Sequence, residues 1–273
     1  MILFPNAKIN LGLDILRRRP DGYHDIETVM IPVDWCDILE IVPAAGAETT
    51  LTVSGRAVEC PVEKNLVMKA YRALSAITDV PAADIYLQKI IPDGAGLGGG
   101  SADAAFTLCG LNEVFSLGLS DSTLAEIAAG IGADCPFFIH NRPMLCTGTG
   151  TDMSPIEIDL LGYTLVIAKP QVSVPTAAAY SRVRPHIPVT PLATRLSQPV
   201  DMWKGSVVNE FEPSVFPLYP AVEQLKSLFS TGGAVYTAMS GSGSSVYAIF
   251  TSDKLAEEMT AHLEECEIRV IRL

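Results

Sequence analysis

The chain reads Pro92-Asp93-Gly94-Ala95-Gly96-Leu97-Gly98-Gly99-Gly100-Ser101-Ala102-Asp103-Ala104-Ala105 between a predicted strand over 84–91 and a predicted helix over 101–114. Five of the seven residues from 94 to 100 are glycine. Glycine adopts positive φ and lets the backbone come close to a ligand, so consecutive N–H groups can form an anion-binding nest. The helix that follows adds free N–H groups and the positive end of its dipole. The stretch therefore predicts a phosphate-binding loop rather than a flexible turn.

Two common kinds of phosphate loop do not fit this stretch. Gly94, Gly96 and Gly99 match the dinucleotide fingerprint G-x-G-x-x-G, which is a weak signal by itself. That fingerprint needs a second strand ending in an acidic residue about twenty residues on, whereas here a second helix is predicted over 120–131. A Walker A loop needs lysine before its Ser or Thr, and Gly100 precedes Ser101. The loop is therefore of a third kind, and a dinucleotide-dependent oxidoreductase is disfavoured.

The rest of the chain predicts a mixed α+β fold. Apolar alternation predicts strands in the first ninety residues, and a period near 3.6 predicts one helix there. The strands are expected over 9–15, 28–33, 38–42, 50–53 and 84–91, and the helix over 66–77. After a strand over 163–168 and a proline-rich surface loop over 185–199, we expect a helix, two strands, a helix and a strand, over 221–229, 234–239, 245–250, 253–265 and 268–273. This order suits an α+β sandwich at the C-terminal end.

Composition and charge exclude several classes of protein. The 273 residues suggest one large domain or two modest ones. The formal net charge of −12 argues against binding nucleic acid or an anionic membrane surface. No apolar run reaches the roughly 18–20 residues that span a bilayer, and we expect no signal peptide. The six cysteines have no C-x-x-C spacing, so we expect reduced thiols in a cytoplasmic protein and no metal bound by protein ligands alone.

Three motifs resemble those of one enzyme family. The loop at 92–105 is similar to the phosphate loop of the GHMP kinases, named after galactokinase, homoserine kinase, mevalonate kinase and phosphomevalonate kinase. Two more stretches resemble the first and third motifs of that family, in the same order along the chain: Pro5-Asn6-Ala7-Lys8-Ile9-Asn10-Leu11 and Met239-Ser240-Gly241-Ser242-Gly243-Ser244-Ser245. The resemblance implies an ATP-binding N-terminal domain over 1–155, similar to domain 2 of ribosomal protein S5, and a ferredoxin-like C-terminal domain over 156–273. It also implies an active site between them.

Three further stretches narrow the resemblance within the family. They are similar to signatures of the members that phosphorylate a cytidine-diphosphate-linked methylerythritol in non-mevalonate isoprenoid synthesis: Pro20-Asp21-Gly22-Tyr23-His24, Gly132-Ala133-Asp134-Cys135-Pro136-Phe137-Phe138 and Asn209-Glu210-Phe211-Glu212-Pro213. Many relatives carry a second serine where this chain has Ala102, and aspartate is more usual than Glu210. A homoserine or mevalonate type of kinase, and a catalytically silent binding protein of the same fold, remain as alternatives.

The resemblance also implies roles for individual residues at the reacting end. Asp134 is the expected base for the acceptor hydroxyl, on a short stiff turn between Gly132 and Pro136. Lys8 would lie beside it, keep it ionised and offset charge on the transferring phosphoryl group. Mg²⁺ would be held largely by ATP and water, with the Ser101 hydroxyl as its candidate protein ligand. ATP itself would be bound by the loop and by two residues at the adenine end: Pro92, Gly94, Ala95, Gly96, Leu97, Gly98, Gly99, Gly100, Ser101, Asn65 and Lys89.

At the other end of the substrate, the resemblance implies an aromatic clamp. Tyr23 and Tyr180 would stack on the cytosine, a general way to hold a base, and His24 would read its edge. The remaining expected contacts are Asn10 beside Lys8, Thr176 on the polar acceptor, and the third-motif loop residues Gly241, Ser242 and Gly243. The partners are thus two small molecules, and the sequence leaves a monomer and a homodimer both open.

Overall fold

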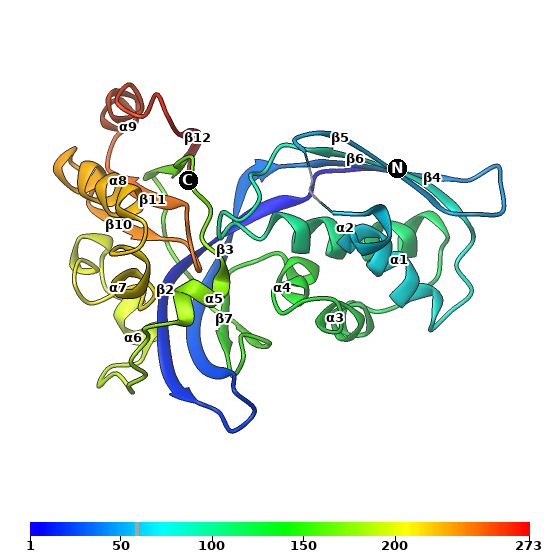
Figure 1. Ribbon diagram of the computed structural model, residues 1–273, viewed down its shortest axis with the longest axis horizontal. Helices are drawn as coiled ribbons and strands as arrows, with labels where there is room; N and C mark the ends of the chain where they lie inside the picture. Colours follow the sequence, from blue (N-terminus) through cyan, green and yellow to red (C-terminus); the bar gives the residue numbers. More distant parts are fainter. Residues whose placement is uncertain (58–59) are drawn as a thin grey trace. The chain divides into compact units, whose positions relative to one another are not determined.

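A computed structural model describes residues 1–57 and 60–273 (Figure 1). Its contacts divide the chain into two compact units, each made of discontinuous segments. Unit 1 comprises Met1–Lys8, Asp34–Asp93 and Gly98–Arg142, and unit 2 comprises Ile9–Val33, Gly94–Leu97 and Pro143–Leu273. The chain therefore passes between the units several times, and the division at residue 155 drawn from motif order stays a prediction.

Unit 1 is one four-stranded sheet covered by helices. The strand order is β1 (Ile2–Leu3), β4 (Ile38–Pro43), β6 (Ala83–Lys89) and β5 (Thr50–Gly55), and only the β5–β6 pair is parallel. Its helices lie on one side of the sheet in Figure 1: α1 (Leu66–Ser75), α2 (Gly99–Val114), α3 (Asp121–Ala129) and α4 (Cys135–His140). Helix α2 contacts the sheet closely at Gly110, where an ideal Cβ would lie 2.6 Å from Leu3 Cδ1 and 2.7 Å from Ile41 Cδ1. Glycine at that position allows this close packing.

Unit 2 holds two four-stranded sheets. One has the order β2 (Asn6–Arg18), β3 (His24–Cys36), β7 (Met144–Thr147) and β8 (Asp152–Pro155), and the first two strands also extend into unit 1. The other has the order β10 (Tyr236–Met239), β11 (Val246–Phe250), β9 (Thr164–Lys169) and β12 (Glu267–Arg272), with antiparallel neighbours. Strands β9 and β11 are buried along their whole length, as expected for strands inside a sheet that is covered on both faces.

Most helices of unit 2 pack on a core of aliphatic side chains that also contains three phenylalanines. The helices of this unit are α5 (Thr176–Tyr180), α6 (Leu192–Leu196), α7 (Glu212–Val215), α8 (Pro220–Thr231) and α9 (Asp253–Thr260). Phe211, Phe229 and Phe250 are buried in this core, and the last two rings meet edge to face with centroids 6.4 Å apart. Among the described residues, no helix is both long and apolar enough to cross a bilayer.

Most predicted elements are confirmed, and two need correction. The stretch 185–199, predicted as a surface loop, contains helix α6, because the buried side chains of Leu192 and Leu196 hold it against the fold. Helix α9 ends at Thr260 rather than 265, so the glutamates beyond it are not helical. Several short elements were not predicted from the sequence: β1, α4, α5, α7, β7 and β8.

Candidate active site

The glycine loop has the backbone geometry that its composition predicts. Gly94, Gly96 and Gly98 have φ of 60°, 74° and 72°, and Gly98 is the left-handed residue that precedes α2. An ideal Cβ at Gly96 would lie 2.0 Å from the carbonyl oxygen of Ser240, so any side chain there would collide with backbone. The free N–H groups at the start of α2 therefore follow directly on a stretch of left-handed glycines, which is an arrangement that suits phosphate.

Lys8 and Asp134 form an ion pair in unit 1. Lys8 Nζ lies 3.5 Å from Asp134 Oδ2, and the two side chains are 4% and 33% exposed. Asp134 directly precedes α4 but makes no side-chain hydrogen bond that caps it, so capping does not explain the residue. An ideal Cβ at Gly98 would lie 3.1 Å from Lys8 Cγ, so the pair adjoins the point where the loop becomes helix α2. The pair thus has the geometry expected of the predicted base and its lysine, and the role of Asp134 as the base stays a prediction.

The neighbouring cysteine is not part of this chemistry. Cys135 is fully buried, and its burial raises the pKa of the thiol to about 11, even though a hydrogen bond with the Ser101 side chain acts to lower it. The thiol is therefore protonated at neutral pH and unreactive. Its contact with Ser101 ties the turn that carries Asp134 to the start of α2.

The third-motif loop is bonded to the glycine loop within unit 2. Ser240 Oγ donates a hydrogen bond to the carbonyl oxygen of Gly96 at 2.9 Å, and the N–H of Ser245 donates to the carbonyl oxygen of Ala95 at 3.1 Å. Gly241 and Gly243 have φ of 53° and 86°, which lets the loop turn tightly. Together these bonds fix the first half of the phosphate loop.

Asn209 supports the third-motif loop, a role that the sequence did not predict. Its Nδ2 donates to the carbonyl oxygens of Met239 at 2.7 Å and Gly241 at 2.8 Å, and its Oδ1 accepts from the N–H of Phe211 at 2.9 Å. Glu212 Oε1 accepts from the N–H of Met239 at 2.9 Å. In the sequence, the stretch Asn209–Pro213 is marked only by its resemblance to a family signature. In the structure, Asn209 and Glu212 hold the third-motif loop.

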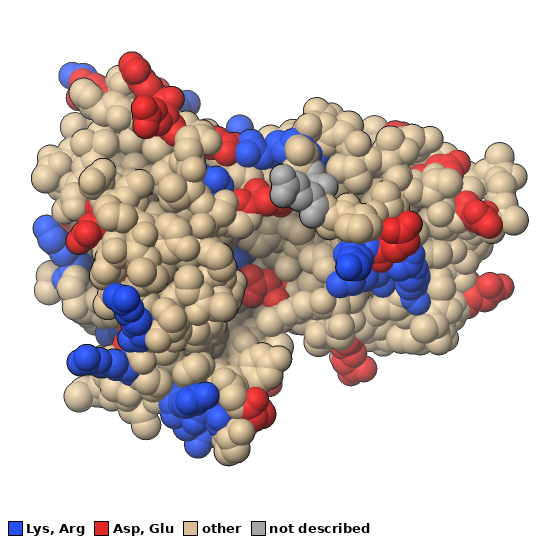
Figure 2. Space-filling view, viewed as in Figure 1, with Lys and Arg blue, Asp and Glu red and all other residues tan. Residues whose placement is uncertain are grey.

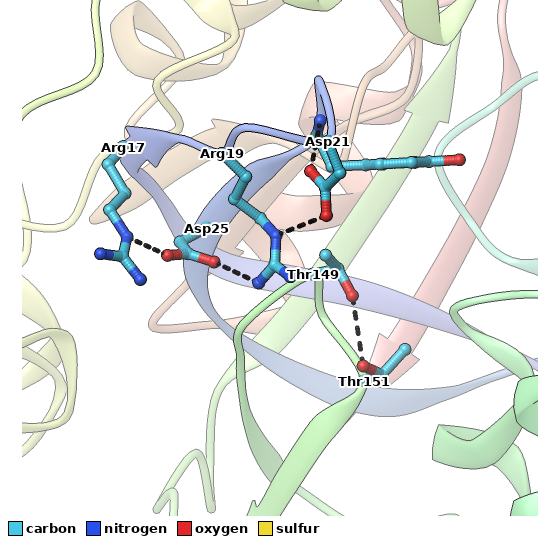
Figure 3. A network of polar contacts seen from close by, with 7 residues as sticks. Arg17, Arg19, Asp21, Asp25, Thr149 and Thr151 are labelled. Atoms are coloured by element: carbon cyan, nitrogen blue, oxygen red, sulfur yellow. Dashed lines mark hydrogen bonds and ion pairs between the residues drawn. The ribbon is translucent and has the colours of Figure 1, made fainter.

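Arginine side chains brace the hairpin between β2 and β3. Arg19 Nε lies 3.0 Å from Asp21 Oδ2, and Arg19 Nη1 lies 3.0 Å from Asp25 Oδ1 (Figure 3). Arg17 Nε also pairs with the Asp25 carboxylate. The backbone N–H of Arg19 donates to the carbonyl oxygen of Tyr23 at 2.8 Å. These contacts fix the turn that carries the first expected base-stacking residue.

The aromatic residues expected at the cytidyl end are only partly brought together. His24 stacks on Tyr180 with ring centroids 4.9 Å apart and an angle of 20° between the planes, and Phe211 meets Tyr180 edge to face. Tyr23 is 68% exposed on the hairpin. The structure therefore pairs Tyr180 with His24, and a clamp formed by Tyr23 and Tyr180 stays a prediction.

Two other residues expected at the acceptor have neighbours in unit 2. The hydroxyls of Thr176, at the start of α5, and Ser242, in the third-motif loop, lie 3.5 Å apart. Asn10 Nδ2 donates to Thr28 Oγ1 at 2.9 Å, and its carbonyl oxygen accepts from the Tyr247 hydroxyl at 2.8 Å. Asn10 is thus held by its neighbours, while Thr176 is exposed beside the third-motif loop.

Asn65 and Lys89, expected at the adenine end, border a cavity of about 100 Å³ in unit 1. Asn65 is the N-cap of α1, where its Oδ1 accepts from the N–H of Val67 at 2.9 Å. The Lys89 ammonium is bonded to the buried carboxylates of Asp37 and Asp103. Both residues therefore have structural tasks, and their contact with adenine stays a prediction.

Within residues 1–57 and 60–273, no three His, Cys, Asp or Glu side chains gather in a way that could hold a metal ion. The glycine loop supports the binding of a nucleotide phosphate. Side chains at Gly96 or Gly98 would meet Ser240 or Phe138, so the loop conformation requires glycine there, and a glycine loop of this kind suits phosphate.

A glycine-rich loop that leads into a helix N-terminus, beside a lysine–aspartate pair, is typical of a small-molecule kinase. Comparison with family models supports this: the model for the GHMP kinases N terminal domain matches residues 65–142, and the model for the GHMP kinases C terminal domain matches residues 195–267. The chain belongs to the GHMP kinase family, whose members are ATP-dependent phosphotransferases.

Individual relatives agree with the family. The chain is 51% identical over 250 residues to the 4-diphosphocytidyl-2-C-methyl-D-erythritol kinase of Parabacteroides distasonis, covering 92% of each chain. It is 48% identical over 268 residues to the enzyme of that name from Bacteroides fragilis, covering 97% of this chain and 98% of the relative. A crystal structure of 4-(cytidine 5'-diphospho)-2C-methyl-D-erythritol kinase has a TM-score of 0.82 at 30% identity, over 99% of this chain and 98% of that one. The GHMP kinase fold expected from the sequence is thus confirmed.

Proposed function

We propose that this chain is a 4-diphosphocytidyl-2-C-methyl-D-erythritol kinase, which transfers the γ-phosphoryl group of ATP to the 2-hydroxyl of its cytidyl substrate in non-mevalonate isoprenoid synthesis. The observation that carries the proposal is the Lys8–Asp134 pair next to Gly98, in a chain 51% identical to a relative of that name. A catalytically silent protein would have no use for this pair, and nothing in the site favours homoserine or mevalonate over the cytidyl substrate.

In the proposed mechanism, Asp134 accepts the proton of the acceptor hydroxyl as its oxygen attacks the γ-phosphorus. The bond from that phosphorus to the bridging oxygen of ADP breaks, and ADP leaves. Lys8, which lies 3.5 Å from Asp134, offsets charge that develops on the phosphoryl oxygens. The enzyme thereby supplies positioning and charge, which phosphoryl transfer mainly requires.

ATP is proposed to lie with its phosphates on the N–H groups of the loop from Gly94 to Gly100 and on the start of α2. Mg²⁺, bound with ATP, would neutralise charge on the β- and γ-phosphates, with the Ser101 hydroxyl as its candidate protein ligand. Asn65 and Lys89 border the cavity that we propose for the adenine end.

The cytidyl end is proposed to bind at the aromatic residues of unit 2. The His24–Tyr180 stack offers a preformed aromatic surface, and the exposed ring of Tyr23 on the braced hairpin supplies a second one. Thr176 would hydrogen-bond the polar acceptor, next to Ser242. All six cysteines are free thiols, which supports our placement of the reaction in the reducing cytoplasm.

Steady-state ADP release tests the substrate assignment. We expect turnover with ATP, Mg²⁺ and 4-diphosphocytidyl-methylerythritol, and none above background with homoserine or mevalonate. A folded enzyme that ignored the cytidyl substrate but phosphorylated one of the others would replace this proposal with another GHMP activity. No turnover with any of the three would favour the silent binding protein.

A further inference from the structure

Unit 1 contains a second group of buried charges, separate from the Lys8–Asp134 pair. The side chains of Asp37, Lys89 and Asp103 are 0%, 2% and 4% exposed. Lys89 Nζ lies 2.7 Å from Asp103 Oδ2 and is also hydrogen-bonded to Asp37 Oδ2. We call these three residues the loop cluster. Burying charges costs free energy even when they are paired, so a cluster in this place calls for a reason.

The cluster brackets the glycine loop along the chain. Strand β6 ends at Lys89, and Asp103 lies in the second turn of α2, just after the loop. Asp37 comes from the connection between β3 and β4 and reaches the same point. Its Oδ1 accepts hydrogen bonds from the N–H groups of Ile90 and Ile91, the first two residues after the strand. The Asp37 carboxylate thus holds the backbone that leads into the loop. Lys89 connects this carboxylate to Asp103 in α2, the helix that follows the loop.

The packing at Gly99 leaves little room for this arrangement to shift. An ideal Cβ at Gly99 would lie 3.0 Å from Ile91 Cγ2 and 3.4 Å from Lys89 Nζ. The first residue of α2 is therefore in close contact with the residues that Asp37 holds. A change in the position of Lys89 or Ile91 would be passed directly to the N-terminus of α2, where phosphate is expected to bind.

The net charge of the loop cluster matters because the cluster lies next to the loop that is expected to bind phosphate. With one ammonium and two carboxylates, the cluster carries a net negative charge if all three groups are ionised. Burial raises the pKa of Asp103 to about 8, against the pull of Lys89. The two carboxylates raise the pKa of Lys89, although burial acts to lower it. A raised pKa favours the neutral form of the Asp103 carboxyl, which lowers the negative charge that the cluster places near the expected phosphate site.

We propose that Asp37 is a positioning residue for ATP, which sets the glycine loop through Lys89 and the N–H groups of Ile90 and Ile91. The proposal rests on the kinase function proposed above. It implies that removing the Asp37 charge displaces the ends of the loop and weakens nucleotide binding. Binding of the cytidyl substrate should not change, because its proposed contacts lie on other elements.

The test compares Asp37→Asn with Asp14→Asn. Asparagine keeps the shape of Asp37 and can still accept the N–H bonds, but it leaves Lys89 without this counter-ion. Asp14 is a matched control, because it is also buried and pairs with a single arginine, Arg195, in unit 2. Both variants should lower the melting temperature. Only Asp37→Asn should raise the KM for ATP, by about tenfold to a hundredfold, since misplacement by about 1 Å costs up to about 10²-fold.

A direct binding measurement keeps this test independent of the acceptor substrate. Calorimetry with Mg²⁺ and a non-hydrolysable ATP analogue should show the same loss for Asp37→Asn and no loss for Asp14→Asn. Should Asp37→Asn fail to fold, Asp37→Ser, which also removes the carboxylate but leaves Lys89 in place, is measured in the same way. Nucleotide affinity within twofold of wild type in a folded Asp37 variant, or an equal loss in Asp14→Asn, would overturn the proposal.

Discussion

At the scale of single residues, the site depends most on positions where only glycine fits. Gly96 combines a φ of 74° with an ideal Cβ position 2.0 Å from the Ser240 carbonyl oxygen. The sequence could predict that the loop needs glycine, because five of seven residues are glycine. It could not predict which of them makes the closest approach, because Ser240 lies far along the chain.

We expect Gly96→Ala to abolish nucleotide binding and to lower stability well beyond the cost of the left-handed backbone. Gly118→Ala is a matched control, because Gly118 has a φ of 73° and no atom within 4 Å of its ideal Cβ. The control should lose about 1–2 kcal/mol, the cost of an L-residue in this conformation. Urea unfolding and calorimetry with an ATP analogue measure both effects, and an equal cost in the two variants would show that the contact with Ser240 does not matter.

Asp103 should make stability depend on pH. Its pKa is about 8 in the folded chain against an ordinary value of 3.8, mainly because of burial, with Lys89 and Asp37 as its charged neighbours. The folded state thus holds a proton that the unfolded state has already released above about pH 4. The free energy of unfolding that this group contributes should therefore fall as the pH rises from about 4 through 8.

Asp103→Asn removes this titration. Urea unfolding at pH 5, 7 and 9 should show that the variant gains stability relative to wild type as the pH rises. Lys89 does not confuse the comparison, because its pKa is raised above 10.5, outside this range. A difference between variant and wild type that stayed constant from pH 5 to 9 would mean that Asp103 is ionised throughout.

At the scale of elements, the hairpin between β2 and β3 presents the expected base-binding residues. Pro20–His24 was readable in the sequence as a turn signal, and the strands on either side are confirmed as β2 and β3. The bracing by Arg19 was not readable, because it depends on the side chains of Asp21 and Asp25 meeting across the turn (Figure 3).

We expect Arg19→Gln to raise the KM for the cytidyl substrate by about two- to fivefold and to leave the KM for ATP unchanged. The effect is small because partly exposed ion pairs contribute little. Arg272→Gln is the control, because Arg272, in β12 of another sheet, forms an exposed pair with Asp253 at the start of α9. Equal KM values for the cytidyl substrate in the two variants would show that the contacts of Arg19 do not affect binding of that substrate.

Short elements set the limit of prediction from this sequence. Helix α4 has only six residues, so neither periodicity nor propensity marks it, although it fixes the turn of Asp134. Helix α6 lies among prolines and forms because Leu192 and Leu196 are buried against residues distant in sequence. In contrast, β6 shows the alternation of buried and exposed residues that its sequence predicts.

At the scale of the whole molecule, the family and the fold could be predicted from the sequence, because the three family motifs at 5–11, 92–105 and 239–245 occur in a fixed order. What joins these motifs was not readable. Asn209 holds the third-motif loop and Ser240 holds the glycine loop through bonds between residues 30 to 144 positions apart. Such contacts are products of the tertiary fold, and no local pattern encodes them.

The charge of the whole chain also fits a small anionic ligand better than an extended one. The net charge is −12, yet the basic and acidic side chains in view lie in small, separate groups over a largely uncharged surface (Figure 2). This distribution supports the proposal that phosphate is bound locally, by backbone N–H groups and a few buried cations such as Lys8.

The central claim is that Asp134 accepts the proton of the acceptor hydroxyl, and the kcat of Asp134→Asn tests it most directly. Asparagine matches the shape of aspartate but cannot take the proton, and Asp121→Asn, at the start of α3, controls for a lost surface charge. We predict that the kcat with the cytidyl substrate falls by about 10²-fold or more in Asp134→Asn, while its KM for ATP stays the same. The kcat of Asp121→Asn should equal that of wild type. A kcat within a few-fold of wild type would contradict the account and would leave Lys8 and the glycine loop to explain the rate.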